Sequence, residues 1–93
     1  MLDTNEYFEG KVKSIAFKNS DLDSTVGVMA IGEYTFSTSK KETMTVVSGA
    51  LTVNLPGSAE WQTFEAQQSF IVEAGASFDL RVEVETAYLC TYE

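Results

Sequence analysis

The chain has 93 residues, no histidine, one cysteine and a formal net charge of -8. This length predicts one domain, residues 1–93, that buries about two-thirds of its unfolded surface, a modest core that dimerisation would extend. The negative charge repels nucleic acid, so binding to DNA or RNA is not expected. Without histidine, Cys/His and Ser/His nucleophile pairs are excluded and most zinc, iron and copper sites are improbable, while one cysteine excludes an intrachain disulfide.

The N-terminal segment, residues 1–10, has neither the basic start nor the apolar run of a signal peptide. No stretch approaches the roughly 20 apolar residues of a membrane span. A cytoplasmic protein without membrane contact is therefore expected. Leu2, Tyr7 and Phe8 suit an arm that lies across another sheet, either of a neighbouring subunit or of the same chain.

Short alternating or β-branched runs recur along the remaining chain, without a helical period, so the sequence predicts an all-β barrel or sandwich. The predicted strands cover residues 11–17, 26–31, 33–38, 43–47, 50–55, 61–66, 69–72, 77–84 and 86–92. Segment 18–25 is predicted to be a polar loop. The apolar run 26–31 is expected to be buried on both faces or to lie in a sandwich core, with Gly27 at a bulge or a close backbone approach.

Local sequence signals predict a hairpin at the centre of the chain and the register of a later strand. Strands 43–47 and 50–55 are predicted to form a hairpin, because Ser48-Gly49 can take positive φ. Pro56 ends the second strand, since it has no N–H for a ladder. In 77–84 apolar and charged residues alternate so regularly that a slip of one residue would bury the charged row.

The stretch GEYTFSTSKKETMTVVSGALTVNLPG, residues 32–57, resembles the first cupin motif, with Glu42 at the motif glutamate and Gly49 at its closing glycine. In ordinary cupins two histidines bind a metal together with that glutamate, and Thr35 and Ser37 occupy their positions here. In the second motif the turn glycine remains, but Phe78 replaces the histidine. The resemblance implies a single cupin-type barrel, a jelly-roll-like double-stranded β-helix, without metal ligands.

A closer resemblance runs over nearly the whole chain. The segments NEYFEGKVKSIAF, VGVMAIGEYTFST, ETMTVVSGALTV and YLCTY, with the region around Trp61, are similar to the small single-domain cupins of the pyrimidine/purine nucleoside phosphorylase family. The resemblance implies a metal-independent pentosyltransferase without a cofactor, which cleaves purine and pyrimidine nucleosides with inorganic phosphate to free base and ribose 1-phosphate. It also implies a homodimer.

Phosphorolysis needs bound phosphate, stabilisation of positive charge on the sugar and hydrogen bonds to the departing base. The polar row Glu33, Thr35 and Ser37 is expected to line the cavity, where Thr35 and Ser37 would bind substrate. If Tyr34 and Phe36 point inward instead, the same row is a solvated face.

Charged and aromatic side chains complete the expected site. Lys40 and Lys41 would bind phosphate, or else form an exposed loop tip. Glu42 would be catalytic, holding ribose hydroxyls or facing the developing charge, or else a surface carboxylate paired with one of these lysines. The single arginine, Arg81, would bind phosphate through its guanidinium, or else face solvent beside Asp79 and Glu83.

Aromatic side chains could stack on the base, although most of them are needed for the core. The candidates are Tyr34, Phe36, Phe78, Tyr88 and Tyr92, and Phe78 is taken as substrate-binding. Cys90 is expected to be a small buried hydrophobic residue.

Two other functions fit the fold. A non-catalytic cupin that binds a small molecule or a sugar phosphate would also lack the histidines. A metal-dependent dioxygenase or isomerase is disfavoured by the missing histidines.

Overall fold

The computed structural model describes residues 2–19 and 22–93, and every regular element within these ranges is a β-strand. Ten strands follow one another along the chain: β1 (Asp3–Tyr7), β2 (Val12–Asn19), β3 (Leu22–Met29), β4 (Gly32–Ser37), β5 (Glu42–Ser48), β6 (Ala50–Asn54), β7 (Trp61–Glu65), β8 (Ser69–Val72), β9 (Ser77–Val82) and β10 (Thr86–Tyr92). The described residues include no helix of the length and apolar character that crossing a membrane requires.

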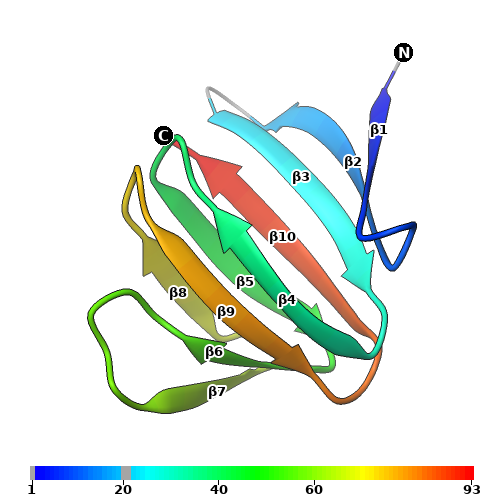
Figure 1. The fold of residues 1–93 in the computed structure, drawn as a ribbon. Coiled ribbons are helices and arrows are strands. Elements are labelled where there is room, and N and C mark those ends of the chain that lie inside the picture. The colour runs from blue at the N-terminus through cyan, green and yellow to red at the C-terminus, as the bar shows by residue number, and fades with distance from the viewer. Residues whose placement is uncertain (1, 20–21) are drawn as a thin grey trace.

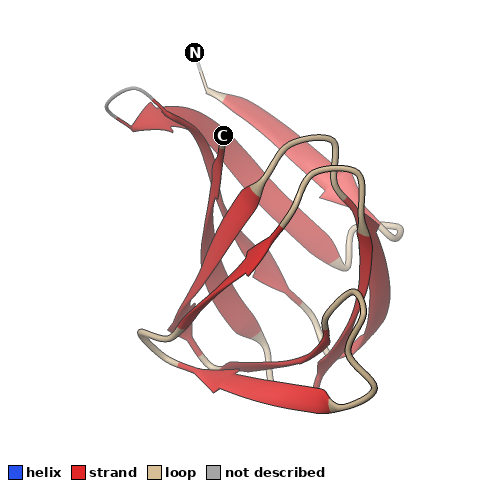
Figure 2. Ribbon diagram, turned by 90° about the vertical axis from the view of Figure 1, so that its left-hand side faces the viewer, coloured by secondary structure: helices blue, strands red, loops and turns tan. Residues whose placement is uncertain are grey.

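The strands form two antiparallel sheets that face each other (Figures 1 and 2). The larger sheet has the order β1-β2-β3-β10-β5-β8, and the smaller has the order β4-β9-β6-β7. The predicted all-β class is confirmed. Among the described residues no strand pairing joins the two sheets, so the architecture is a cupin-like sandwich of two sheets rather than one continuous hydrogen-bonded barrel.

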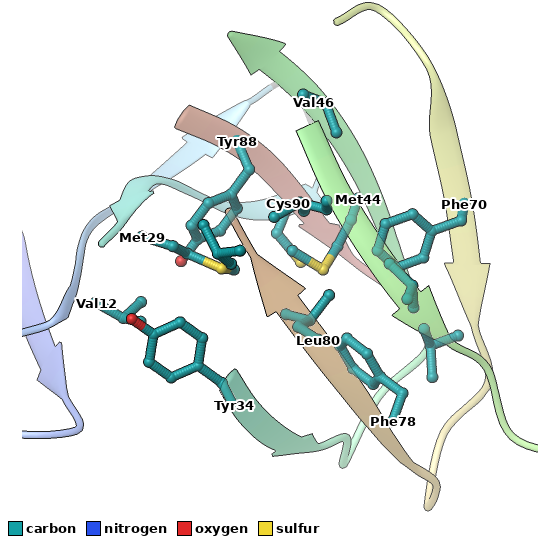
Figure 3. Packing of buried hydrophobic residues seen from close by; sticks show 14 residues of the cluster. Val12, Met29, Tyr34, Met44, Val46, Phe70, Phe78, Leu80, Tyr88 and Cys90 are labelled. Atoms are coloured by element: carbon teal, nitrogen blue, oxygen red, sulfur yellow. The ribbon is translucent and has the colours of Figure 1, made fainter. Parts of the chain in front are cut away.

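Period-two burial places one row of each strand in the interior. In β9, Phe78, Leu80 and Val82 are buried while the residues between them are exposed, as the sequence predicts. In β10 the buried row begins with Thr86, Tyr88 and Cys90. Rows from both sheets meet in one core, where Figure 3 shows Tyr88 and Cys90 opposite Leu80.

Strands β5 and β6 do not form the predicted hairpin. Pairing joins β5 to β10 and β8, whereas β6 pairs with β7 and β9 in the other sheet. The chain therefore crosses between the sheets at Gly49, which has φ 98°. The buried Thr86 hydroxyl fixes this crossing: it accepts a hydrogen bond from Ala50 N–H at 3.2 Å and lies 3.0 Å from Ala50 O and 2.7 Å from Val84 O.

Three other expectations are settled in the N-terminal third. Of the predicted loop 18–25, residues 18–19 belong to β2 and 22–25 to β3, while 20–21 lie outside the described residues. The run 26–31 is not buried on both faces, since Val26 and Val28 are exposed on the outer side of β3. Gly27 does mark a close approach, because a Cβ there would lie 2.6 Å from Lys13 O.

The N-terminal segment lies on its own chain. Strand β1 pairs with β2, and the turn that follows places Phe8 against β4 of the smaller sheet, with ring centroids 4.9 Å from Tyr34 and 5.4 Å from Phe36. Phe8 and Glu9 have positive φ in this turn. The turn thus connects the edge of the larger sheet to the smaller one.

Gly49→Ala is expected to destabilise the fold by about 2 kcal/mol or more, because an alanine would add backbone strain at positive φ and place Cβ 2.5 Å from the Thr86 hydroxyl. Gly57→Ala is the matched control: Gly57 has φ 77°, yet its Cβ would have nothing within 4 Å. Urea unfolding of both variants measures the difference. Equal losses of unfolding free energy would show that Thr86 does not constrain the crossing.

Candidate active site

A cavity of about 190 Å³ lies between the two sheets and receives polar atoms from five strands. Among the described residues, its polar lining consists of Tyr7, Ser14, Ser37, Glu42, Tyr88, Cys90 and Tyr92. Such a convergence of polar groups on an otherwise apolar interior is typical of a ligand site. We take this cavity as the candidate active site.

Glu42 is the only carboxylate that the described residues place on the cavity wall. It begins β5, opposite Tyr92 of β10, and is half-buried. The Cys90 thiol donates to Glu42 Oε1 at 3.5 Å. Burial raises the pKa of Glu42, and the hydrogen bond from Cys90 opposes this rise. Burial, followed by the nearby Glu42 charge, raises the pKa of Cys90 to about 12, so the thiol keeps its proton and remains a donor.

Two tyrosines of β10 flank Cys90. Tyr92 shares a hydrogen bond with Thr25 Oγ1 at 3.1 Å, and burial raises its pKa. Burial also raises the pKa of Tyr88, to about 12. Both phenols therefore stay neutral at physiological pH and can donate or accept hydrogen bonds in the cavity.

The remaining wall is apolar and largely aromatic. Phe36 and Phe78 of the smaller sheet stack with ring centroids 5.9 Å apart, and Tyr7 meets Phe36 edge-on at 6.3 Å. Met29 and Met44 line the side formed by the larger sheet. Flat aromatic faces and flexible thioethers suit a planar heteroaromatic ligand.

The structure divides the predicted polar row of β4. Glu33 and Thr35 face outward, so their expected position on the cavity wall is wrong: Tyr34 and Phe36 take the inward positions. Thr35 donates to Asp79 Oδ1 at 2.7 Å on the exposed face. Ser37 ends the strand and does reach the cavity rim.

The predicted cations lie outside the cavity. Lys40 is exposed and 3.8 Å from Asp23 Oδ2, and Lys41 is half-buried directly before Glu42. Neither lysine lines the cavity. Arg81 lies on the outer face of β9, where its guanidinium stacks 4.0 Å from the ring centroid of Trp61. The solvent-facing alternative for Arg81 therefore describes its position, because the alternation of β9 assigns the inward positions to apolar residues, and its phosphate binding stays a prediction.

The sequence predicts Glu42, Ser37 and Phe78 at the cavity, and the structure adds Ser14 and Cys90 to its polar lining. A signal for Cys90 was present: the inward row of β10 carries a hydroxyl or thiol at every position from Thr86 to Tyr92. An ordinary core strand would use aliphatic residues there. Ser14 gave no comparable signal, because neither face of its strand is cleanly apolar.

The residues do not fit the metal centre of ordinary cupins. Thr35 faces outward and Phe78 offers no ligand atom. No three Cys, Asp or Glu side chains gather anywhere in residues 2–19 and 22–93.

A larger hollow, of about 530 Å³, lies over the outer face of β2 and β3. Its lining combines the apolar side chains of Ile15, Val26 and Val28 with polar residues of β1 and β2 such as Thr4 and Asn5. In the part of the chain that the structure describes, its only charged lining residues are Glu6 and Lys13, so we place the chemistry in the interior cavity instead.

Residues 2–92 match the family model described as pyrimidine/purine nucleoside phosphorylase. Proteins named pyrimidine/purine nucleoside phosphorylase from Teredinibacter turnerae and Magnetococcus marinus are each 66% identical to the chain, over 93 and 92 residues, and each is covered to 99%. The alignments cover 100% and 99% of this chain.

Solved structures support the fold. A Vibrio parahaemolyticus crystal structure, titled as a protein of unknown function, is 49% identical with a TM-score of 0.96, covering 100% of this chain and 99% of that one. An RmlC-like cupin from Shewanella frigidimarina, 20% identical, has a TM-score of 0.77 over 98% of this chain and 82% of its own, which shows the cupin fold alone. The matches to the family model and the relatives span the whole chain, which therefore belongs to the pyrimidine/purine nucleoside phosphorylase family.

Proposed function

We propose that the interior cavity binds a nucleoside and that the protein catalyses its phosphorolysis. A phosphate oxygen forms a bond to C1′ of the ribose while the glycosidic C–N bond breaks. The base leaves with the electron pair and takes up a proton from phosphate or solvent, giving free base and ribose 1-phosphate. The observation that carries this proposal is the half-buried Glu42 at one end of an aromatic-walled cavity, in a chain whose relatives bear the name of this activity.

Glu42 suits the sugar end of the reaction. Its carboxylate can accept hydrogen bonds from ribose hydroxyls and stabilise the positive charge that develops at C1′. Phe78 and Phe36 offer faces for stacking, and Ser37 offers a hydroxyl at the rim. The cavity is smaller than the roughly 300 Å³ of typical drug-sized ligand sites, so phosphate would approach from outside it. Lys40 and Lys41, in the loop before Glu42, are the proposed cations for this approach.

The direct test is release of base from uridine and adenosine, with and without phosphate, in the presence of a chelator. Phosphate-dependent release from both nucleosides supports the proposal. Folded protein that releases no base would favour the alternative, a non-catalytic binding protein. A cytoplasmic location and the absence of a metal requirement stay predictions.

Glu42→Gln is expected to lower kcat/KM for uridine about 100-fold or more, because glutamine keeps the shape but carries no charge. Glu65→Gln is the matched control, since Glu65 is an exposed glutamate of β7 away from the cavity. It should stay within about twofold of wild type. Wild-type turnover in folded Glu42→Gln protein would remove Glu42 from the mechanism.

The same substitution should raise stability at neutral pH. Burial raises the folded-state pKa of Glu42 above its ordinary value of 4.5, so its contribution to stability is present below that value and is lost as pH rises through the folded pKa. Thermal unfolding should give Glu42→Gln a higher midpoint than wild type at about pH 7, with the gap closing near pH 4. A gap that widens toward acid would contradict this sign.

We further propose a homodimer formed through the outer face of β2, β3 and β10. The register of these strands places Ile15, Val26 and Leu89 side by side on neighbouring strands. It also places Val28 next to Ala87. Of the residues lining the hollow on this face, only Glu6 and Lys13 are charged, and they are paired neighbours. A second copy of a chain with net charge -8 meets least repulsion on such a neutral apolar surface, and a two-fold contact would place the same face on both copies.

Val28→Asp is expected to convert the dimer to a monomer in sedimentation or light scattering, because it buries a charge in the contact. Val84→Asp introduces the same charge at a similarly exposed valine, 50% against 51%, in the turn between β9 and β10. It should leave the mass at twice that of the chain. Dissociation of both variants, or of neither, would contradict the proposed face.

A further inference from the structure

The candidate cavity has two chemically different ends along β10. Tyr92 is paired in register with Glu42, whereas Tyr88 is paired with Gly27, which is in turn paired with Ser14. Tyr88 and Tyr92 are four residues apart, or about 13 Å along an extended strand. One end therefore carries the carboxylate of Glu42, while the other carries the hydroxyls of Tyr88 and Ser14.

The Tyr88 end is buried and spatially defined. The Tyr88 side chain is 5% exposed and lies over Gly27 of the neighbouring strand β3, beside Met29 (Figure 3). Ser14 is buried beside it, and Asn5 Nδ2 donates to Ser14 Oγ at 3.4 Å. A Cβ at Gly27 would lie 2.8 Å from the Tyr88 oxygen and 2.9 Å from Ser14 Cβ, so the glycine provides the space in which this phenol lies.

The chemistry of this end selects one part of a nucleoside. A phosphate dianion needs cations or several donors to leave water, and no lysine or arginine in residues 2–19 and 22–93 lines the cavity. The ribose hydroxyls find their acceptor at Glu42, at the opposite end. A nucleobase has apolar faces for Met29 and Phe36 and a polar edge that a neutral hydroxyl can contact.

We propose that the Tyr88 hydroxyl, with Ser14 beside it, is the hydrogen-bond partner of the nucleobase edge farthest from the sugar. A hydroxyl can donate to a carbonyl or accept from an amino group. The same atom thus serves keto and amino bases, and it does not discriminate between purine and pyrimidine rings by charge. This inference rests on the proposed function and assigns the base within the same cavity.

The test compares Tyr88→Phe with wild type on inosine, adenosine and purine riboside. Purine riboside has the same ribose and ring system but no group at the 6-position. Tyr88→Phe is expected to lower kcat/KM for inosine and adenosine about fivefold more than for purine riboside, which corresponds to the loss of one neutral hydrogen bond. The KM for phosphate should not change. Ser14→Ala should lower the ratio of kcat/KM for inosine or adenosine to kcat/KM for purine riboside in the same direction. It replaces Tyr88→Phe as the test variant if Tyr88→Phe does not fold.

Tyr34→Phe is the matched control. Tyr34 is 4% exposed, and its hydroxyl donates to Ala30 O at 2.6 Å rather than lining the cavity. It should keep wild-type substrate ratios. If Tyr88→Phe lowered kcat/KM equally for all three nucleosides and raised the KM for phosphate, Tyr88 would lie at the ribose or phosphate. That result would overturn the inference but leave the proposed phosphorolysis intact. Unchanged kinetics in Tyr88→Phe would also overturn it. Wild-type protein that releases no base would instead overturn the proposed function.

Discussion

The crossing between the two sheets depends on the buried hydroxyl of Thr86. Its oxygen contacts the backbone N–H and carbonyl of Ala50 and the carbonyl of Val84, so it joins the start of β6 to the turn before β10. A hydroxyl that both donates and accepts can partner backbone groups where the chain leaves one sheet for the other, and a buried backbone group left without a partner costs about 1–3 kcal/mol. The crossing places β5 and β6 in opposite sheets, and that separation creates the interior in which the cavity lies.

The interior of this small chain serves two purposes that compete. Core packing favours aliphatic side chains, yet the inward row of β10 carries Tyr88, Cys90 and Tyr92, and β5 adds Glu42. Each of these polar groups loses hydration, which is why burial is the largest cause of every raised pKa among them. Neutral donors surround the single carboxylate, an arrangement that tolerates its charge at some expense of stability. The aromatic contacts of Phe36, Phe70 and Phe78 offset part of this cost.

The outer faces of the two sheets also differ. The smaller sheet presents hydrogen-bonded polar pairs, such as Thr35 with Asp79 and Thr52 with Thr63, together with the Arg81–Trp61 stack. The larger sheet presents Val26, Val28 and Ile15 to solvent. A two-sheet fold has only two such faces, so the contrast separates a water-facing side from a side suited to contact with another copy.

Alternation and turn chemistry by themselves determined most of the strands, because period-two burial is a local property: β9, β10 and the end of β6 before Pro56 follow directly from the sequence. The family resemblance added the expected family and the expected position of Glu42 in the site. Partner choice and facing direction are not local. Whether Ser48-Gly49 closes a hairpin depends on Thr86, 37 residues further along, and whether Thr35 or Tyr34 faces inward depends on which sheet covers β4. Only the tertiary structure decided these points, since each depends on burial against residues distant in the chain.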